Sequence, residues 1–181
     1  MTVTPELQHA VEQWYYREAR LLDGRRFHTW LALCDLGVRY VVPGRGNPLV
    51  DNSMRGDEAM IAVERELEDV ASDGLPLRNE THPYLQMRVE RSTKPNAWAD
   101  NPPARTRRII GNVEITEVSD ERLSVVSSFH LHYARPGMRS FLYAGQRRDE
   151  LLCADGDYRL ARREVVLDMA EIDYPTVGLF F

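Results

Sequence analysis

The stretch Arg105-Thr-Arg-Arg-Ile-Ile-Gly-Asn-Val-Glu-Ile115 begins a series of strand-like segments that fills the rest of the chain. The predicted strands cover residues 106–118, 122–135, 138–152 and 158–168. The turn-forming pairs Ser119-Asp120, Pro136-Gly137 and Asp155-Gly156 separate them. Because short turns join antiparallel neighbours, we expect an antiparallel meander over the second half of the chain.

The first half of the chain is mainly helical. Thr4-Pro5-Glu6 places a capping threonine before a proline, and apolar residues then recur every three or four positions as far as Asp23-Gly24. Shorter helices are predicted at 27–34, 57–71 and 84–91, a strand at 38–43, and a proline-rich connector at 96–103. Helices followed by a curved antiparallel sheet indicate an α+β fold. This arrangement is similar to the cone-shaped cystatin-like, or nuclear-transport-factor-2-like, fold.

The composition is that of a globular protein, with 43% hydrophobic and 28% charged residues in 181. This length suits one domain, residues 1–181. A formal charge of −5 argues against nucleic acid as the main partner. Since neither a membrane-spanning run nor a secretory signal is visible, we expect no membrane partner and a cytoplasmic location. Cys34 and Cys153 lack CxxC spacing and are predicted to be reduced, buried thiols.

The predicted strands differ in how strictly apolar and polar residues alternate. Residues 122–135 alternate clearly, which indicates one core face and one polar face. In residues 138–152, Met138 and Leu142 fall on the face opposite Phe141, and the last predicted strand also has apolar residues on both faces. A sheet with one solvated face should alternate. The second face is therefore predicted to be partly buried, with another subunit as its cover.

His130-Leu-His132 is the most chemically suggestive pair, because side chains two residues apart leave a strand on the same face. The sequence has no HExxH or CxxC motif, so polar side chains on a sheet face or at an interface are favoured over a metal site. A third hypothesis pairs a cavity histidine with a carboxylate, Asp35 or Glu18, as in dehydratases and isomerases of this fold. Cys34 lies in an apolar segment and is predicted to be a core residue.

Several segments, taken in order, carry a resemblance to a known family. They are Tyr16-Arg-Glu-Ala-Arg-Leu-Leu-Asp23, Trp30-Leu-Ala-Leu33, Val38-Arg-Tyr-Val-Val-Pro43, Ala97-Trp-Ala-Asp-Asn-Pro-Pro-Ala-Arg-Thr-Arg-Arg-Ile-Ile-Gly-Asn-Val113, Tyr143-Ala-Gly-Gln-Arg-Arg-Asp149, Leu160-Ala-Arg-Arg163 and the closing Leu179-Phe-Phe181. Together they resemble the small (β) subunits of bacterial aromatic-ring-hydroxylating dioxygenases. The resemblance covers nearly the whole chain, and its specificity lies in the ordered combination of segments.

The resemblance implies a structural subunit of a terminal oxygenase that adds O2 to an aromatic ring and gives a cis-dihydrodiol. Members of the family assemble with a large α subunit, commonly as an α3β3 hexamer that also brings β subunits together. The α subunit holds a Rieske [2Fe–2S] cluster and a mononuclear Fe(II), and electrons reach it from NADH through a ferredoxin and reductase system. No catalytic residue, cofactor or metal ligand is implied for this chain, which also lacks the Cys-x-His…Cys-x-x-His pair of a Rieske cluster.

Interface residues are predicted at the connector and the start of the first long strand: Trp98, Asn101, Pro103, Arg105, Arg107 and Arg108. Aromatic and arginine side chains are enriched in interface cores, and the prolines stiffen this segment. The competing interpretation is that Trp98 packs in its own core while the arginines are solvated. As a nucleic-acid patch, the arginine cluster is too short and isolated in an acidic chain. The alternative function is a free-standing dehydratase or isomerase.

Overall fold

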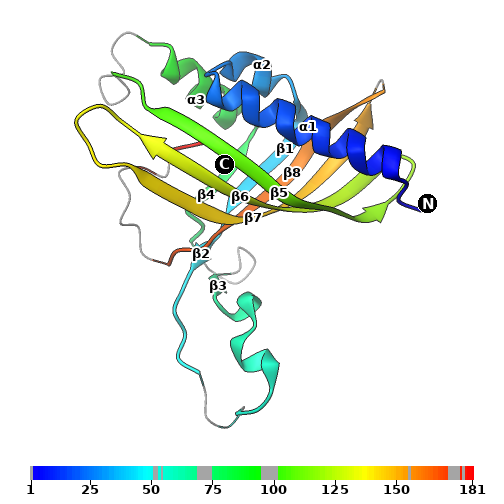
Figure 1. Cartoon of the computed structure of the whole chain (residues 1–181), viewed down its shortest axis with the longest axis vertical. Helices are drawn as coiled ribbons and strands as arrows, with labels where there is room; N and C mark the ends of the chain where they lie inside the picture. Colours follow the sequence, from blue (N-terminus) through cyan, green and yellow to red (C-terminus); the bar gives the residue numbers. More distant parts are fainter. Residues whose placement is uncertain are drawn as a thin grey trace.

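A strongly curved six-stranded sheet organises the computed structural model, in the order β4-β1-β8-β7-β6-β5 (Figure 1). The described residues are 2–50, 53, 55–68, 75–94, 102–154, 156–170, 176 and 178–181. The strands of the large sheet are β1 (Cys34–Val42), β4 (Arg78–Thr81), β5 (Arg105–Val118), β6 (Arg122–Ala134), β7 (Phe141–Ala154) and β8 (Asp157–Leu167). The antiparallel meander predicted from the turn signals is confirmed for β5 to β8.

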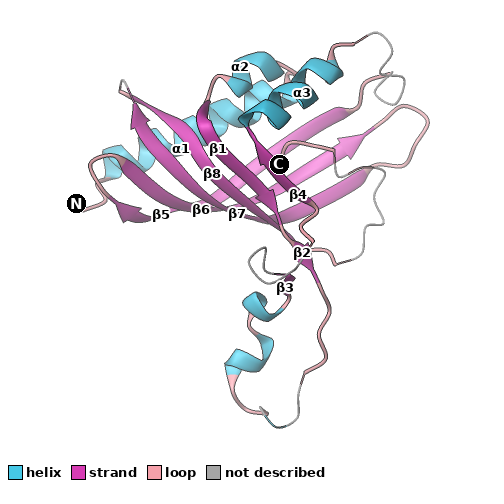
Figure 2. Ribbon diagram, turned by 180° about the vertical axis from the view of Figure 1, so that it is seen from behind, coloured by secondary structure: helices cyan, strands magenta, loops and turns pink. Residues whose placement is uncertain are grey.

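The helices α1 (Pro5–Asp23), α2 (Phe27–Leu31) and α3 (His82–Ser92) lie on the concave side of the sheet (Figures 1 and 2). The predicted first helix is confirmed, and the Thr4 hydroxyl accepts a hydrogen bond from the Leu7 N–H at 3.2 Å. At its ends Gln8 donates to the Val113 carbonyl at 2.7 Å, and Asp23 accepts from the Arg108 N–H at 2.8 Å, which fixes α1 along β5. None of the described helices is long and apolar enough to span a membrane.

The predictions for shorter elements need correction. The second helix ends at Leu31 rather than at residue 34, because Cys34 already begins β1. That strand is longer than the predicted 38–43, and it runs parallel to β8, with the edge strand β4 on its other side. The edge strand β4 was not predicted, since its sequence Arg-Asn-Glu-Thr contains no apolar residue to mark it. It pairs antiparallel with the end of β1 and leads directly into α3.

The described residues 44–50, 53 and 55–68, called the arm here, leave the sheet on the side away from the helices (Figures 1 and 2). The arm begins with β2 (Gly44–Arg45), which pairs with β3 (Leu67–Glu68), and contains the short 3-10 helices η2 (Glu58–Ile61) and η3 (Val63–Arg65). The predicted helix over 57–71 is therefore wrong as far as residue 68, and residues 69–71 lie outside the described part. Neither short helix buries a residue, so no packed face supports a longer one.

The core lies between the helices and the concave face of the sheet. Its largest fully buried apolar side chains include Trp30, Tyr40, Tyr143 and Phe181. The closing segment Leu179–Phe181, called the tail here, enters this core from the far end of the chain. The Phe180 ring packs at a tilt against Trp30 with centroids 4.3 Å apart, and the Phe181 ring centroid lies 5.5 Å from that of Tyr143. The tail therefore supplies part of the core that the helices and sheet surround.

A bulge explains why the last strand does not alternate. Leu160 pairs with Leu151 and Arg162 pairs with Glu150, so one extra residue lies in β8 between them. As a result Leu160 and Arg163 both point into the core, and both are fully buried. For Leu160 the broken alternation thus reflects a bulge within the chain and gives no sign of a partner. In contrast, Leu142 remains about half exposed on the outer side of β7. Met138 is also about half exposed, but it lies in the connection before β7, which begins at Phe141 and not at the predicted residue 138.

At Gly145 the backbones of β7 and β8 approach too closely to leave room for a side chain. A Cβ atom at this position would lie 2.3 Å from the Val166 carbonyl oxygen and 3.1 Å from the Leu167 Cα, both backbone atoms. Gly145→Ala should therefore lower the free energy of unfolding by about 2 kcal/mol or more, measured by urea denaturation. Gly111→Ala in β5 is the control, since its Cβ would meet no atom within 4 Å. Equal stability of the two variants would contradict the close approach.

Candidate functional site

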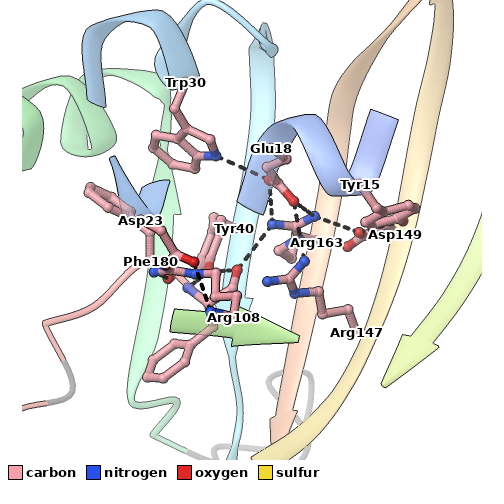
Figure 3. Close-up of polar contacts among 11 residues, drawn as sticks. Tyr15, Glu18, Asp23, Trp30, Tyr40, Arg108, Arg147, Asp149, Arg163 and Phe180 are labelled. Atoms are coloured by element: carbon pink, nitrogen blue, oxygen red, sulfur yellow. Dashed lines mark hydrogen bonds and ion pairs between the residues drawn. The ribbon is translucent and has the colours of Figure 1, made fainter. Parts of the chain in front are cut away.

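Arg163 lies inside the cone, where its guanidinium group binds two carboxylates (Figure 3). Its Nη1 and Nη2 atoms donate to the two Glu18 oxygens at 2.7 and 3.0 Å. Its Nε and Nη2 atoms donate to the two Asp149 oxygens at 2.9 and 2.7 Å. All three side chains are essentially inaccessible to solvent. Such paired, planar contacts are the geometry that arginine forms best with carboxylates.

Further side chains complete this buried network. The Tyr15 hydroxyl donates to Asp149 at 2.7 Å, and the Trp30 indole N–H donates to Glu18 at 3.0 Å. Arg147 reaches Glu18 at 3.2 Å, with its guanidinium over the Phe129 ring at 5.2 Å. Two arginines thus face two carboxylates, and aromatic groups supply the remaining contacts. The buried charges are balanced, which a low-dielectric interior requires.

The tail is tied to the same network through its backbone. The Tyr40 hydroxyl donates to the Phe181 carbonyl and accepts from the Phe181 N–H, each at 2.8 Å. Arg163 donates to the same carbonyl at 3.0 Å. Arg108 binds the Phe180 carbonyl at 2.5 Å and forms an ion pair with Asp23 at the end of α1. The interior of the cone is therefore occupied by the protein's own side chains and tail.

The network favours its charged state. Burial alone would raise the pKa of Glu18, but the positive charges of Arg163 and Arg147 outweigh burial and hold it below the ordinary value. Burial raises the pKa of Tyr15, and the neighbouring Asp149 charge raises it further, so this phenol stays protonated as a donor. Buried ion pairs of this kind serve the fold, although Nε and Nη2 of Arg147 have no hydrogen-bond partner among the described residues. A general acid or base, in contrast, needs a proton that substrate can reach.

The histidine hypothesis fails on geometry. His130 and His132 are exposed on the outer face of β6, whereas Glu18 lies inside the cone. Asp35 lies at the start of β1, where its side chain accepts from the Gly37 N–H at 2.7 Å. Neither carboxylate is therefore brought to a histidine across a cavity. Among the described residues, no group of three His, Cys, Asp or Glu side chains is placed to hold a metal ion.

The two cysteines differ, which corrects one prediction. Cys34 is buried as predicted, and burial, followed by the negative charge of Glu18, raises the pKa of its thiol to about 12. Cys153 is exposed near the end of β7, so the prediction of a second buried thiol is wrong. Cys153 shares the face of β7 that is buried at Leu151, but it lies next to the end of the strand, where the burial stops.

The outer face of β5, β6 and β7 presents a second candidate site. Strand register places Arg107, His132 and Leu142 in one row. Ile109, His130 and Ala144 form the adjacent row. Ile109 is 68% exposed and Leu142 52% exposed. We call the set Arg105, Arg107, Ile109, His130, His132 and Leu142 the outer patch.

The structure separates the predicted interface residues. Pro103, Arg105 and Arg107 are exposed, and the two arginines belong to the outer patch. Arg108 points inward and forms its contacts with Asp23 and the tail of its own chain. Trp98 and Asn101 lie outside the described residues. Arg108 therefore supports the fold behind the patch, since neighbouring strand residues face opposite sides of the sheet.

Of the buried network, the sequence singles out only Glu18, as a carboxylate that could pair with a cavity histidine. A signal was present in the alternation of β7. Tyr143, Arg147, Asp149 and Leu151 share one face, so two charged residues stand at positions where the strand pattern requires core residues. Opposite charges at inward positions two residues apart indicate a buried ion pair. The partner residues on α1 and β8 could not be assigned from spacing alone.

Comparison with known proteins gives a consistent picture. Residues 17–174 match the sequence model of the ring hydroxylating beta subunit family. The chain is 30% identical to the β subunit of benzene 1,2-dioxygenase from Pseudomonas putida, over 99% of this chain and 91% of that protein. A structure of naphthalene 1,2-dioxygenase superposes with a TM-score of 0.80 at 24% identity, covering 99% of this chain and 88% of the other. The benzoate 1,2-dioxygenase β subunit from Burkholderia mallei gives 0.69 at 20% identity, with 99% of both chains covered. The predicted cone-shaped α+β fold is confirmed.

Loss of the Glu18 charge should destabilise the fold. Glu18→Gln keeps the shape of the side chain but leaves Arg163 and Arg147 with one buried carboxylate fewer. We expect the free energy of unfolding at neutral pH to fall by about 3–5 kcal/mol, measured by urea denaturation. Glu121→Gln, at an exposed position, should change it by less than about 0.5 kcal/mol. A Glu18→Gln protein as stable as Glu121→Gln would contradict a stabilising role.

The same variant should alter the response to acid. Because the folded-state pKa of Glu18 is lowered, its stabilising contribution is complete above the unfolded value of about 4.5 and disappears as pH falls through the folded value. The stability difference between wild type and Glu18→Gln should therefore shrink on acidification below about pH 4.5. A difference that stays constant to low pH would contradict the assigned pKa direction.

Proposed function

Because this chain belongs to the ring-hydroxylating dioxygenase β-subunit family, we propose that it is the structural, non-catalytic subunit of a terminal oxygenase. The complex adds O2 to an aromatic ring to give a cis-dihydrodiol, as part of a multicomponent system in the cytoplasm. The observation that carries a non-catalytic role is the interior of the cone. Arg163, its two carboxylates and the tail occupy the space in which a cone-fold enzyme would hold its substrate.

The chemistry of this system is proposed to lie in a large α subunit. A Rieske [2Fe–2S] cluster needs paired cysteines and histidines, and a mononuclear iron needs two histidines and a carboxylate. The histidines of the outer patch stand beside arginine, isoleucine, leucine and alanine in the strand register, a donor set that suits neither centre. NADH would then supply electrons to the α subunit through separate ferredoxin and reductase proteins, with α3β3 as the proposed stoichiometry.

The contribution of this chain is proposed to be a rigid surface for assembly. The outer patch combines exposed aliphatic side chains with arginines. The other face of the same sheet is held in place by the buried network. Arginine and large apolar groups are favoured at interface cores, and a preformed surface loses little entropy on binding. Arg105 and Arg107 belong to this surface, and Trp98, Asn101 and Pro103, which precede β5 in the sequence, are proposed to extend it. Arg108 is proposed to hold β5 in place from inside.

The division of labour can be tested by expressing the chain with and without the large subunit. Alone, the chain should be colourless and should not turn over aromatic substrates. Together with the large subunit it should form a brown, iron-containing complex that is active when the electron-transfer proteins and NADH are supplied. Cofactor-free dehydratase or isomerase turnover by the isolated chain, lost in His130→Ala or His132→Ala, would contradict the proposal.

The assembly surface can be tested with a double variant. Arg105→Ala with Arg107→Ala removes two exposed charges, and we expect several-fold less of this chain in the full-size complex captured through a tag on the large subunit. The thermal stability of the isolated chain should not change, since neither side chain is buried.

A matched control removes two other arginine side chains, which lie at the opposite end of the sheet. Arg122 and Arg159 are both exposed, and each is paired in register with Leu152. Alanine at both positions should leave assembly at the wild-type level. Full assembly of the Arg105→Ala, Arg107→Ala chain would remove these residues from the interface.

A further inference from the structure

Arg147 has two buried nitrogen atoms, Nε and Nη2, with no hydrogen-bond partner among the described residues. The side chain is fully buried, and its third nitrogen, Nη1, donates to Glu18 at 3.2 Å. Buried donors are rarely left unpaired, because they have lost their contact with bulk water and gain nothing in its place. The interior beside Arg147 is therefore a candidate binding site.

The two unpaired nitrogens form one edge of the guanidinium group. The Nε–H and one Nη2–H bond point the same way, and together they make the fork with which arginine binds oxygen atoms. Arg163 uses this edge on Asp149, with distances of 2.9 and 2.7 Å. Arg147 instead contacts Glu18 through Nη1 (Figure 3), which leaves its fork without an acceptor among the described residues. The group that completes Arg147 is thus expected to be an oxygen.

Ser127 supplies a third unpaired polar atom at the same place. Strand register pairs Ser127 on β6 with Arg147 on β7, and both side chains are fully buried on the inner face of the sheet. The Ser127 Oγ atom also lacks a hydrogen-bond partner among the described residues. Directly paired residues of antiparallel strands have Cβ atoms about 4.5–5.5 Å apart. The same ligand can therefore lie within reach of the arginine fork and the serine hydroxyl.

The surroundings of this pair limit the size of the ligand. The Phe129 ring lies beneath the Arg147 guanidinium, 5.2 Å from its central carbon. Val165 follows Arg147 in the register on β8, and Val125 lies next to Ser127 on the same face of β6, both of them buried. Serine is the smallest side chain of this group, so the space lies beside it. A ligand here must be very small and is shielded from solvent.

Charge decides between a small anion and a neutral ligand. The positive charges of Arg163 and Arg147 are already balanced by the carboxylates of Glu18 and Asp149. A chloride ion would add a buried charge with no counter-ion, which is unfavourable in a low-dielectric interior. A neutral oxygen that both accepts and donates hydrogen bonds avoids this cost.

We propose that a water molecule is bound inside the cone, between the fork of Arg147 and the hydroxyl of Ser127. The water accepts from the Nε–H or Nη2–H of Arg147 and shares a hydrogen bond with Ser127. It completes the buried network from the side of the sheet, as Tyr15 and Trp30 complete it from the helices. Internal waters of this kind are part of a fold and are costly to remove.

A crystal structure of the full chain, obtained once with chloride and once with bromide as the halide, tests the identity of the ligand. Both should show the same water-sized density within about 3.2 Å of Ser127 Oγ and of Nε or Nη2 of Arg147. Neither should show an anomalous signal there. A bromide signal at this place would identify an anion and overturn the proposal. An Arg147 fork bonded directly to a protein oxygen, with no density between it and Ser127, would overturn it as well.

Ser127→Ala tests the site in solution, with Ser128→Ala as the matched control on the opposite face of the same strand. If Ser127 binds the water, its loss should raise the unfolding equilibrium constant about threefold or more above that of Ser128→Ala, measured by urea denaturation. If the hydroxyl were unpaired, its removal would relieve an unfavourable burial. A Ser127→Ala chain at least as stable as Ser128→Ala would therefore overturn the proposal.

Discussion

The rest of the structure depends on one constraint, which is that the buried Arg163 must form ion pairs with two carboxylates. A buried guanidinium without partners would cost far more than a small domain can tolerate, so Glu18 on α1 and Asp149 on β7 must both reach it. Satisfying Arg163 therefore fixes where α1 crosses the sheet. It also fixes the bulge in β8, because without the extra residue Leu160 and Arg163 would point to opposite faces.

The elements that the sequence predicted well are those whose own pattern determines them. The first helix has a capping threonine and a continuous apolar stripe, and the long strands are bounded by strong turn pairs. The failures share a different cause. The predicted helix over 57–71 had helix-forming residues but no surface to pack on, and it forms short 3-10 turns instead. Strand β4 forms only because the edge of β1 is there to pair with it.

The candidate sites show the same difference between features that a local sequence pattern determines and features that only the folded chain determines. Exposed outer-patch residues such as Arg105 and Arg107 could be selected from the sequence, because arginines at the start of a strand stand out by composition. That Arg108 belongs to the interior follows from strand parity once the register is known, and the register depends on β6. The buried network links α1, β7, β8 and the tail across more than a hundred residues of sequence. No local pattern encodes such a set, and only the folded sheet brings it together.

A filled cone has a consequence for how such a fold can work. In a cone-fold enzyme the concave side must stay open to admit substrate, so the ligand replaces part of the core. Here Phe180 and Phe181 take that space, and their backbone carbonyls satisfy donors on Arg108 and Arg163 that a ligand would otherwise have to satisfy. The interior thereby becomes a source of rigidity. The surfaces that remain exposed are the outer face of the sheet and the arm, and both present uncovered aliphatic side chains.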